Sequence, residues 1–305
     1  MSRPSPALPA GLAAAISRQL EHRPRKALQE SAQRLSENYR ARKPTDAAIR
    51  DETDALAYAL TRMPATYAAI VAALGRLTEQ KPDFTPETLL DAGCGLGAAA
   101  YAASAVWPAL GRMTLLDRSP AFLALAARLA AESGAEAVAA AEIIRADLGR
   151  LPAASPASDL VAVSYALTEL LEADLAAVAE ALWARTAGAL VIVEPGTPRD
   201  HARLMTIRAR LIALGATILA PCPHQGPCPV QPPDWCHFSI RLPRSREHKL
   251  LKDAQAPFED EKFSYLIAVR DGAPCAARLI APTRISKPGL AAKLCTRDDG
   301  VQEIF

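Results

Sequence analysis

Between residues 87 and 215, short apolar runs alternate with amphipathic stretches at helical spacing, and this alternation constrains the fold more than any other feature of the sequence. The apolar runs, which we predict to be strands, lie at 87–93, 111–119, 142–148, 158–167 and 189–196. The stretches with helical spacing lie at 98–110, 120–133, 171–187 and 200–215. Near-continuous apolar strands separated by helices are typical of a parallel sheet covered on both faces. The sequence therefore predicts an α/β fold.

The flanking segments suggest how the rest of the chain is organised. Apolar positions recur at helical spacing through residues 11–80, which predicts a helical N-terminal extension over residues 1–82 and an α/β domain over residues 83–305. After Gly215 the chain becomes rich in proline and cysteine, so we expect a Cys-rich insertion over residues 216–236, ahead of the sixth strand. We expect strands six and seven to form an antiparallel hairpin at 236–242 and 262–270, and residues 282–305 to form a polar tail.

The chain of 305 residues is close to electrically neutral. It has 35 Lys and Arg against 33 Asp and Glu, so its bulk charge does not indicate a nucleic-acid-binding protein. The cations are nevertheless concentrated in two stretches, which are suited to neutralising phosphates and are equally typical of solvated helix faces and loops. The first stretch comprises Arg3, Arg18, Arg23, Arg25, Lys26, Arg34, Arg40, Arg42 and Lys43, and the second comprises Arg241, Arg244, Arg246, His248, Lys249 and Lys252.

The sequence also bears on location. No apolar run reaches the roughly 18–20 residues that a membrane-spanning helix needs, so we expect no membrane association. The first residues lack the apolar core of a signal peptide and fit an amphipathic helix better. We therefore expect a monomeric cytoplasmic protein.

A glycine-rich loop follows the first predicted strand and opens the first helix of the α/β domain. It reads Asp91-Ala-Gly93-Cys94-Gly95-Leu-Gly97. Glycines two residues apart let the chain turn sharply and let its backbone approach a ligand without Cβ clashes. The D-x-G-x-G-x-G pattern resembles motif I of the S-adenosylmethionine-dependent methyltransferases. The resemblance implies that Asp91 faces the cationic amino-acid end of that cofactor, whereas Cys94 reads as a small filler residue.

Two further acids lie at the ends of the next two strands. Asp117 closes the second strand, where a carboxylate can accept both ribose hydroxyls, and Asp147 closes the third. In the methyltransferases that position holds the adenine amino group beside an apolar neighbour, here Leu148. Each acid alone is explained as well by a helix N-cap or a turn. Three acids at the ends of three consecutive strands favour a cofactor site, because the carboxyl ends of the strands in open α/β sheets bind ligands.

The end of the fourth strand does not reveal a reaction. It has neither an N/D-P-P-Y/F signature nor a Pro-Cys pair, so a covalent attack on a pyrimidine ring lacks its nucleophile. Tyr165 and Glu169 are suited to shaping a pocket, and the start of a helix explains them equally well. Methyl transfer can proceed through proximity and orientation alone. Whether the chain is an enzyme therefore stays open, and no catalytic residue is assigned.

Six cysteines in a chain expected in the cytoplasm favour a metal or redox role over disulfides. Cys222, Cys228 and Cys236 lie within fifteen residues among prolines, and Cys295 or Cys275 is available as a fourth ligand. Four cysteines fit an iron–sulfur cluster, and zinc would accept the same set or recruit His224 or His237. The alternative is a set of unpaired thiols without a metal.

Several motifs together resemble one family, the methyltransferase-like small-ribosomal-subunit assembly proteins of mitochondria and their bacterial relatives. They are residues 35–40 (LSENYR), the Asp91–Gly97 loop, residues 193–198 (VEPGTP), and residues 220–224 (APCPH) with Cys228 and Pro229. The resemblance implies a [4Fe–4S] cluster held by Cys222, Cys228, Cys236 and Cys295. It also implies contact with small-subunit ribosomal RNA, and methyl transfer is doubtful for the family.

The sequence therefore predicts a Rossmann-like seven-strand methyltransferase sheet with a helical N-terminal extension and a Cys-rich metal-binding insertion. The expected function is that of an assembly factor that binds ribosomal RNA or a small-subunit precursor, with S-adenosylmethionine as ligand or substrate. Two alternatives stay open: an active rRNA methyltransferase and a small-molecule methyltransferase.

Overall fold

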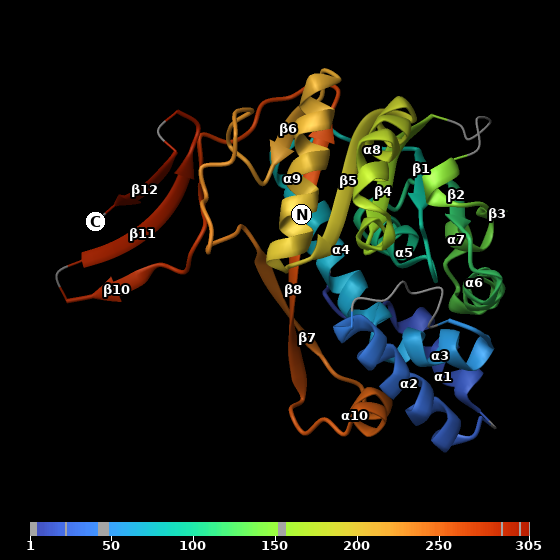
Figure 1. The fold of residues 1–305 in the computed structure, drawn as a ribbon. Helices are drawn as coiled ribbons and strands as arrows, with labels where there is room; N and C mark the ends of the chain where they lie inside the picture. The colour runs from blue at the N-terminus through green and yellow to red at the C-terminus, as the bar shows by residue number, and fades with distance from the viewer. Residues whose placement is uncertain are drawn as a thin grey trace.

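The centre of the structure, a computed structural model, is a mixed sheet of eight strands (Figure 1). The structure describes residues 5–21, 23–41, 49–151, 157–287, 289–298 and 300–304. The order across the sheet is β3-β2-β1-β4-β5-β8-β6, and β7 pairs with an extension of β8. The strand bounds are β1 Thr88–Ala92, β2 Arg112–Asp117, β3 Glu142–Arg145, β4 Ser158–Ser164, β5 Thr186–Pro195, β6 Thr217–Ala220, β7 Phe238–Pro243 and β8 Phe258–Val269.

The first five strands are parallel, as their apolar composition predicts, and β8 runs antiparallel to both β5 and β6. The order reverses between β1 and β4: the chain first builds outward through β2 and β3 and then returns to the other side of β1. Ligands of open α/β sheets bind at the carboxyl ends of the strands beside such a reversal. This strand order, with the antiparallel strand β8 inserted between β5 and β6, is that of the Rossmann-like methyltransferase fold.

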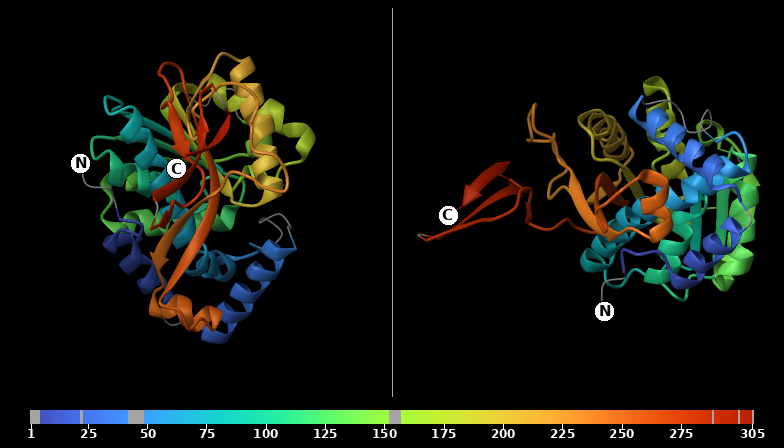
Figure 2. Two further views of the ribbon diagram at one scale, coloured as in Figure 1. Left: turned by 90° about the vertical axis from the view of Figure 1, so that its left-hand side faces the viewer. Right: turned by 90° about the horizontal axis from the view of Figure 1, so that it is seen from below.

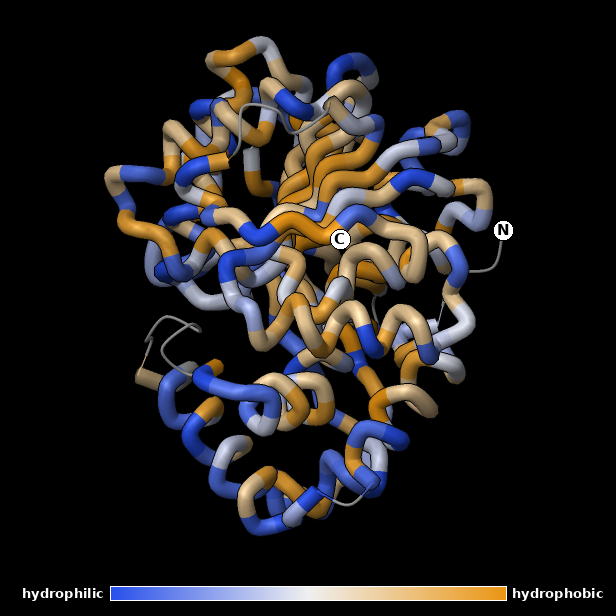
Figure 3. The backbone as a smooth tube through the Cα atoms, turned by 90° about the vertical axis from the view of Figure 1, so that its right-hand side faces the viewer, coloured by the Kyte–Doolittle hydropathy of each residue, from blue (hydrophilic) through white to orange (hydrophobic). Residues whose placement is uncertain are grey.

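Helices cover both faces of the sheet, and neighbouring residues of one strand enter opposite cores. Leu89 of β1 packs with α4, α5 and α6, whereas Leu90 packs with α8 and α9. This alternation follows from the two-residue period of a strand. Figure 3 shows the central strands as the most apolar part of the molecule. These helices span α4 Met63–Gln80, α5 Ala98–Val106, α6 Pro120–Ser133, α8 Leu175–Ala184 and α9 Pro198–Ala213, and a short α7 spans Glu136–Ala139.

The N-terminal helices lie at one end of the molecule and share its main core (Figure 1). They are α1 Ala10–Leu20, α2 Arg25–Arg40 and α3 Glu52–Thr61. α1 and α3 contact α6, and α2 and α3 contact α10, a helix at Arg246–Lys252 between β7 and β8. A helical N-terminal region is therefore observed, while its division from the rest at residue 82 stays a prediction.

Two expectations for the end of the sheet were wrong. The sheet has eight strands and not seven, and the sixth strand is β6, which precedes the proline-rich segment instead of following it. β6 has only four residues and runs directly into Pro221, so its apolar side chains merge with the irregular segment in the sequence. The segment 236–242 contributes β7, an additional strand that pairs with the first half of β8.

The connection between β7 and β8 and the C-terminal tail are both more regular than expected. Ser245 accepts a hydrogen bond from the His248 backbone N–H and so begins α10 inside the basic connection. Strands β9 Ala277–Leu279, β10 Arg284–Ser286, β11 Gly289–Thr296 and β12 Val301–Ile304 form a second sheet. This C-terminal sheet projects away from the body of the molecule (Figures 1 and 2). Within the described residues, no helix combines the length and the apolar character needed to cross a membrane.

Candidate cofactor pocket and cysteine pocket

A pocket lies at the carboxyl ends of β1, β2, β3 and β4, where the strand order reverses. Five of the seven predicted cofactor residues line it: Gly93, Gly95, Asp117, Asp147 and Leu148. The other two, Asp91 and Gly97, stand behind the loop and do not line the pocket. Segments that are distant in the sequence therefore meet at the site that the motif predicts.

The glycine loop needs its glycines. Gly93, Gly95 and Gly97 all have positive φ angles, a region that favours glycine. A Cβ atom on Gly93 would lie 2.6 Å from the Cβ of Ala166, so the loop also passes close to the end of β4. The backbone N–H groups of Gly93 and Cys94 both donate to the carbonyl of Leu116, which ties the loop to β2.

The three predicted acids have different surroundings. The Asp117 carboxylate accepts hydrogen bonds from the Gly95 and Ser119 N–H groups, each across 2.8 Å, and burial raises its pKa. Asp147 is exposed and caps a short 3₁₀ turn by accepting the Gly149 N–H, which is the turn role considered from sequence.

Asp91 is fully buried at the end of β1. One of its oxygens accepts the Ala100 N–H across 3.2 Å, and the other has no hydrogen-bond partner among the described residues. Burial raises the pKa of Asp91 to about 7. The carboxylate therefore holds the start of α5 and retains one oxygen for a donor or a cation. Cys94 is buried beside it, and burial raises its pKa well above the ordinary value, consistent with a filler role.

Several pocket residues were not predicted from the sequence. Tyr58, Met63 and Thr66 reach the pocket from α3 and α4 in the N-terminal region, and no motif in that region marks them. Across the pocket, Arg118 pairs with Glu169 at 3.1 Å. Arg118 could have been predicted as a pocket residue, because it directly follows the strand-end Asp117 in the sequence.

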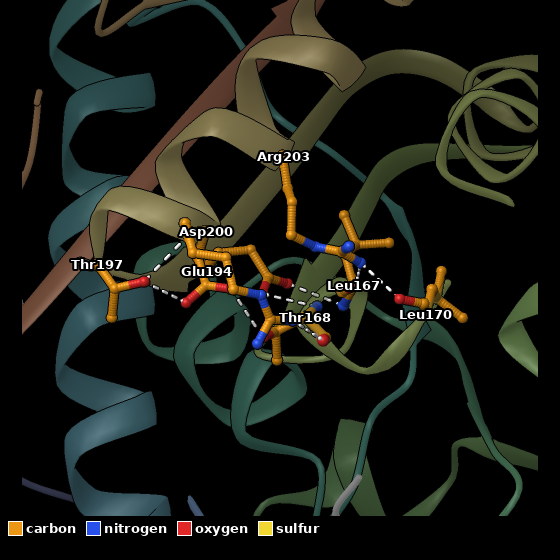
Figure 4. Close-up of polar contacts among 8 residues, drawn as sticks. Leu167, Thr168, Leu170, Glu194, Thr197, Asp200 and Arg203 are labelled. Atoms are coloured by element: carbon orange, nitrogen blue, oxygen red, sulfur yellow. Dashed lines mark hydrogen bonds and ion pairs between the residues drawn. The ribbon is translucent and has the colours of Figure 1, made fainter. Parts of the chain in front are cut away.

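A network of buried polar side chains holds the loop that follows β4 (Figure 4). The Glu194 carboxylate, at the end of β5, accepts the N–H groups of Leu167 and Thr168 at 2.9 and 3.1 Å. Asp200 accepts the Thr168 hydroxyl at 2.9 Å, and Arg203 donates to the carbonyls of Leu167 and Leu170, both at 2.7 Å. Burial raises the pKa of Glu194 to about 8. The start of α9 and the end of β5 therefore fix one wall of the pocket.

Tyr165 occupies the first position after β4 and lines the pocket, as considered from sequence. Its φ angle is 55°, which is uncommon for a residue other than glycine. Its hydroxyl donates to Glu261 of β8 across 2.8 Å. A residue held in this region of backbone space marks a constrained position at the pocket wall.

A second pocket gathers four cysteines from the proline-rich segment and the C-terminal sheet. Cys222, Cys228, Cys236 and Cys295 all line it, whereas Cys275 does not. Burial raises the pKa of Cys236 to about 12 and that of Cys295 to about 11, and neighbouring thiols of the same pocket raise both further. Among the described residues, however, no group of three or more His, Cys, Asp or Glu side chains is arranged to hold a metal ion.

The proline-rich segment has neither helix nor strand between β6 and β7, and side chains hold it in place. Arg208 of α9 donates to the His224 carbonyl at 2.7 Å, and Ser264 of β8 donates to the Cys236 carbonyl at 3.0 Å. The Trp235 indole N–H donates to the Gly196 carbonyl at the end of β5. The segment is therefore anchored to the α/β domain at several points.

Unsatisfied polar groups surround the cysteines. Two of them are donors, Arg278 Nε and Tyr265 Oη, which have no hydrogen-bond partner within the described residues. The same is true of His201 Nε2 and of His224 Nε2, which is an acceptor because His224 Nδ1 donates to the Gly226 carbonyl. The Arg208 side chain makes a hydrogen bond to Cys222, while its Nε atom has no partner in the described part of the chain. Buried donors without acceptors are costly, so their concentration at one place indicates an acceptor that the protein atoms do not supply.

The fold and these two pockets define a Rossmann-like protein of the methyltransferase type with a second, thiol-lined site beside its sheet. The family model for the mitochondrial small ribosomal subunit protein Rsm22 matches residues 52–305. The chain belongs to that family.

The chain is 32% identical over 266 residues to the human protein "Ribosome assembly protein METTL17, mitochondrial", a match that covers 81% of this chain and 56% of the human one. It is 29% identical over 203 residues to "Rsm22-cox11 tandem protein 2, mitochondrial" from Schizosaccharomyces pombe, covering 61% and 27% respectively. The matched region thus spans about half of the human protein and about a quarter of the Schizosaccharomyces pombe protein. A solved magnesium protoporphyrin IX methyltransferase from Synechocystis PCC 6803, with 14% identity, matches with a TM-score of 0.43 over 68% of this chain and 84% of its own.

The comparisons correct one expectation. The curated relatives are named as mitochondrial proteins, and so is the family. The expectation of a cytoplasmic location was therefore wrong. It rested on the missing signal-peptide pattern in the first residues, which does not test for delivery to an organelle.

Proposed function

We propose that this chain is an assembly factor of the small ribosomal subunit that binds ribosomal RNA, S-adenosylmethionine and a [4Fe–4S] cluster. The observation that carries the proposal is the convergence of Cys222, Cys228, Cys236 and Cys295 on one pocket. It is supported by membership of a family described as mitochondrial small ribosomal subunit proteins and by a relative named as a ribosome assembly protein.

The residues around the cysteines fit an iron–sulfur cluster. Four cysteines hold a [4Fe–4S] cluster as thiolates, and hydrogen bonds to its sulfur atoms tune it. Arg278 and Tyr265 carry unsatisfied donors at the pocket, and Arg208 adds a third next to Cys222. When bound, the cluster would supply covalent ties between the proline-rich segment and β11. Zinc on the same four thiolates is the alternative metal.

The pocket at the sheet edge fits S-adenosylmethionine. The cofactor is a cation with an adenosine group, and the pocket combines a glycine loop, Asp117 and Asp147 with the apolar side chain of Leu148. Asp91 adds a buried carboxylate with one unsatisfied oxygen behind the loop. In this arrangement Asp117 would bind the ribose and the glycine loop would lie against the amino-acid end of the cofactor.

Anaerobic purification tests the metal assignment. The protein as purified should be brown and contain about four iron and four sulfide per chain, the content of one [4Fe–4S] cluster. Cys295→Ser should lose the colour and Cys275→Ser should keep it, because Cys295 lines the pocket and Cys275 does not. Stoichiometric zinc without iron under strict anaerobic conditions would replace the cluster by a structural zinc site.

Binding to purified small-subunit precursors and to naked rRNA tests the assembly role. The unmodified protein should bind both, and transfer of labelled methyl groups to immature rRNA would favour the alternative of an active rRNA methyltransferase. Absence of binding to both targets would refute the assembly role.

A further inference from the structure

The exposed apolar side chains of this protein are concentrated on one face of the C-terminal sheet. Eight large apolar side chains are exposed among the described residues, and four of them belong to the C-terminal sheet. Ile285 is 83% exposed, Leu279 51%, Leu290 49% and Ile304 46%. Single exposed apolar side chains are normal on a protein surface, whereas a contiguous group marks a binding surface.

The strand register places these four side chains on the same side. Directly opposed residues of antiparallel strands point to the same face, as do alternate residues of one strand. The pairs are Ile285 with Leu290, Leu279 with Leu294, and Ile304 with Ala292. Leu290, Ala292 and Leu294 are alternate residues of β11, so the three pairs form one continuous face. We call this the outer face.

The opposite, inner face is polar and is already occupied. It carries Cys295 and Arg278, which line the cysteine pocket. Lys293 on the same face pairs with Asp234 of the proline-rich segment at 3.1 Å. The sheet therefore contacts the proline-rich segment through its inner face, and the outer face lies on the opposite side. Figure 2 shows the sheet projecting from the body of the molecule.

The chemistry of the outer face favours a protein partner over nucleic acid. Its remaining strand positions are Ala277, Thr296 and Gln302, so its strands carry no ionised side chain there, while RNA binding draws on Lys and Arg. The cation nearest to Ile285 in sequence, Arg284, lies on the inner face and pairs with Glu303. The complementary surface is an apolar patch on a protein.

The size of the outer face distinguishes between protein partners. Three strands at a spacing of about 4.8 Å, over eight residues rising about 3.4 Å each, give a face on the order of 400 Å². Stable interfaces bury about 800 Å² on each partner, so this face is too small to hold a dimer of the chain by itself. A face of this size is sufficient for a partner that the chain also binds through a second surface.

We propose that the outer face docks an apolar patch on a protein component of the small-subunit precursor while other parts of the chain bind the RNA. This inference rests on the proposed assembly function, which supplies the second point of attachment. β11 thus carries Cys295 of the cysteine pocket on its inner face and docking side chains on its outer face.

The test uses the full chain and purified small-subunit precursors. Ile285→Glu combined with Leu290→Glu should weaken binding to the particle at least tenfold and leave binding to naked rRNA unchanged. Leu171→Glu is the matched control, because Leu171 is 73% exposed and lies outside the sheet. If the double variant does not fold, Ile285→Glu alone serves, since that side chain is largely in solvent. Unchanged particle binding by a folded variant would overturn the inference and leave the assembly role intact.

A photo-crosslinking residue at position 285 identifies the partner. The expected product is a crosslink to a ribosomal protein in the particle, absent when the same residue stands at position 171. Crosslinks to rRNA or to a second copy of the chain would each overturn the proposal. Ile285-dependent flotation with phosphatidylcholine vesicles would overturn it in favour of a lipid surface. Failure of the unmodified protein to bind the particle at all would instead refute the assembly role.

Discussion

The Asp117 carboxylate at the end of β2 accepts a 2.8 Å hydrogen bond from the Gly95 N–H in the loop after β1. Its other oxygen accepts the Ser119 N–H at the start of α6. One buried acid therefore sets the position of the glycine loop and of the next helix at the mouth of the pocket. Asp117 therefore positions the backbone around the pocket independently of any contact it makes with a ligand.

Asp117→Ala should weaken binding of S-adenosylmethionine by about 1–3 kcal/mol, the range for losing hydrogen bonds to a charged acceptor. Isothermal calorimetry on the folded variant measures the change. Asp159→Ala is the control, because Asp159 also holds backbone N–H groups of the sheet, those of Glu87 and Thr88, and lines a different pocket. An equal loss of affinity in both variants would assign the effect to loosening of the sheet. No affinity in the unmodified protein would refute the cofactor assignment.

Affinity for S-adenosylmethionine should rise with pH as Asp91 ionises. Burial raises the pKa of Asp91 to about 7, and a cationic ligand favours the ionised carboxylate, so binding should strengthen several-fold between pH 6 and 7.5. Asp91→Asn should bind more weakly and lose this pH dependence. Calorimetry at both pH values, in a buffer with low ionisation enthalpy, makes the comparison. An unchanged pH profile in the variant would show that another group is responsible.

The same group should affect stability in the opposite direction. An acid whose folded pKa is raised stabilises the fold below its unfolded pKa near 3.8, and this contribution is lost as pH rises through about 7. Without cofactor, the free energy of unfolding should therefore fall between pH 4 and 7. Urea titrations of the unmodified protein and of Asp91→Asn should show a flatter dependence in the variant over that range.

The sheet was predictable because its strands are long enough and apolar enough to be read one by one. The strands at β1 to β5 and the helices between them follow the period of their side chains, and the glycine loop marks where they bind a ligand. β6 was missed because four residues carry too little pattern next to Pro221. The C-terminal strands were predicted to be a polar tail because their apolar residues alternate with polar ones such as Arg284 and Lys293. Strands with one polar face are less easily recognised in a sequence than strands that are buried on both faces.

The pocket was only partly predictable for a related reason. Asp117 and Gly95 are local to motifs, while Tyr58 and Met63 reach the pocket through packing of the N-terminal helices, which no short pattern encodes. Several cations of the two basic stretches form ion pairs with acids of the chain, which the sequence alone did not reveal. Arg18 and Arg34 are paired with Glu132 and Asp54. Arg3, Arg42 and Lys43 of the first stretch lie outside the described residues.

Arg203 should contribute strongly to the fold because it joins α9 to the loop after β4. Arg203→Met removes a charged donor from the carbonyls of Leu167 and Leu170 and should cost about 2–3 kcal/mol in the free energy of unfolding. Arg210→Met on the same helix is the control, since its pair with Glu180 is exposed and should contribute less than about 1 kcal/mol. Urea denaturation gives both values. Equal costs would place the stabilising role in the helix as a whole and not in the buried contacts.

RNA binding through the second basic stretch should depend on the cations that the protein leaves without an acid. Arg241 is held by both oxygens of Asp260, each at 2.8 Å, and His248 is buried, whereas Arg246 and Lys249 of α10 have no ion-pair partner in the part of the chain that the structure describes. Replacing Arg246 and Lys249 together with Ala should weaken binding to small-subunit rRNA and reduce the salt slope of log K by roughly 1.4–1.8, for two phosphate contacts.

Arg241→Ala is the matched control for that experiment. It removes one positive charge from the same stretch. A guanidinium already neutralised by Asp260 does not neutralise a phosphate and so releases no counterion from the RNA, and the salt slope should stay nearly constant. Filter binding between 50 and 200 mM salt, a range that resolves slopes of this size, measures all three proteins. If Arg241→Ala flattens the slope as much as the double variant, RNA competes with Asp260 for the arginine. If neither changes it, α10 is a solvated helix and the RNA is bound elsewhere.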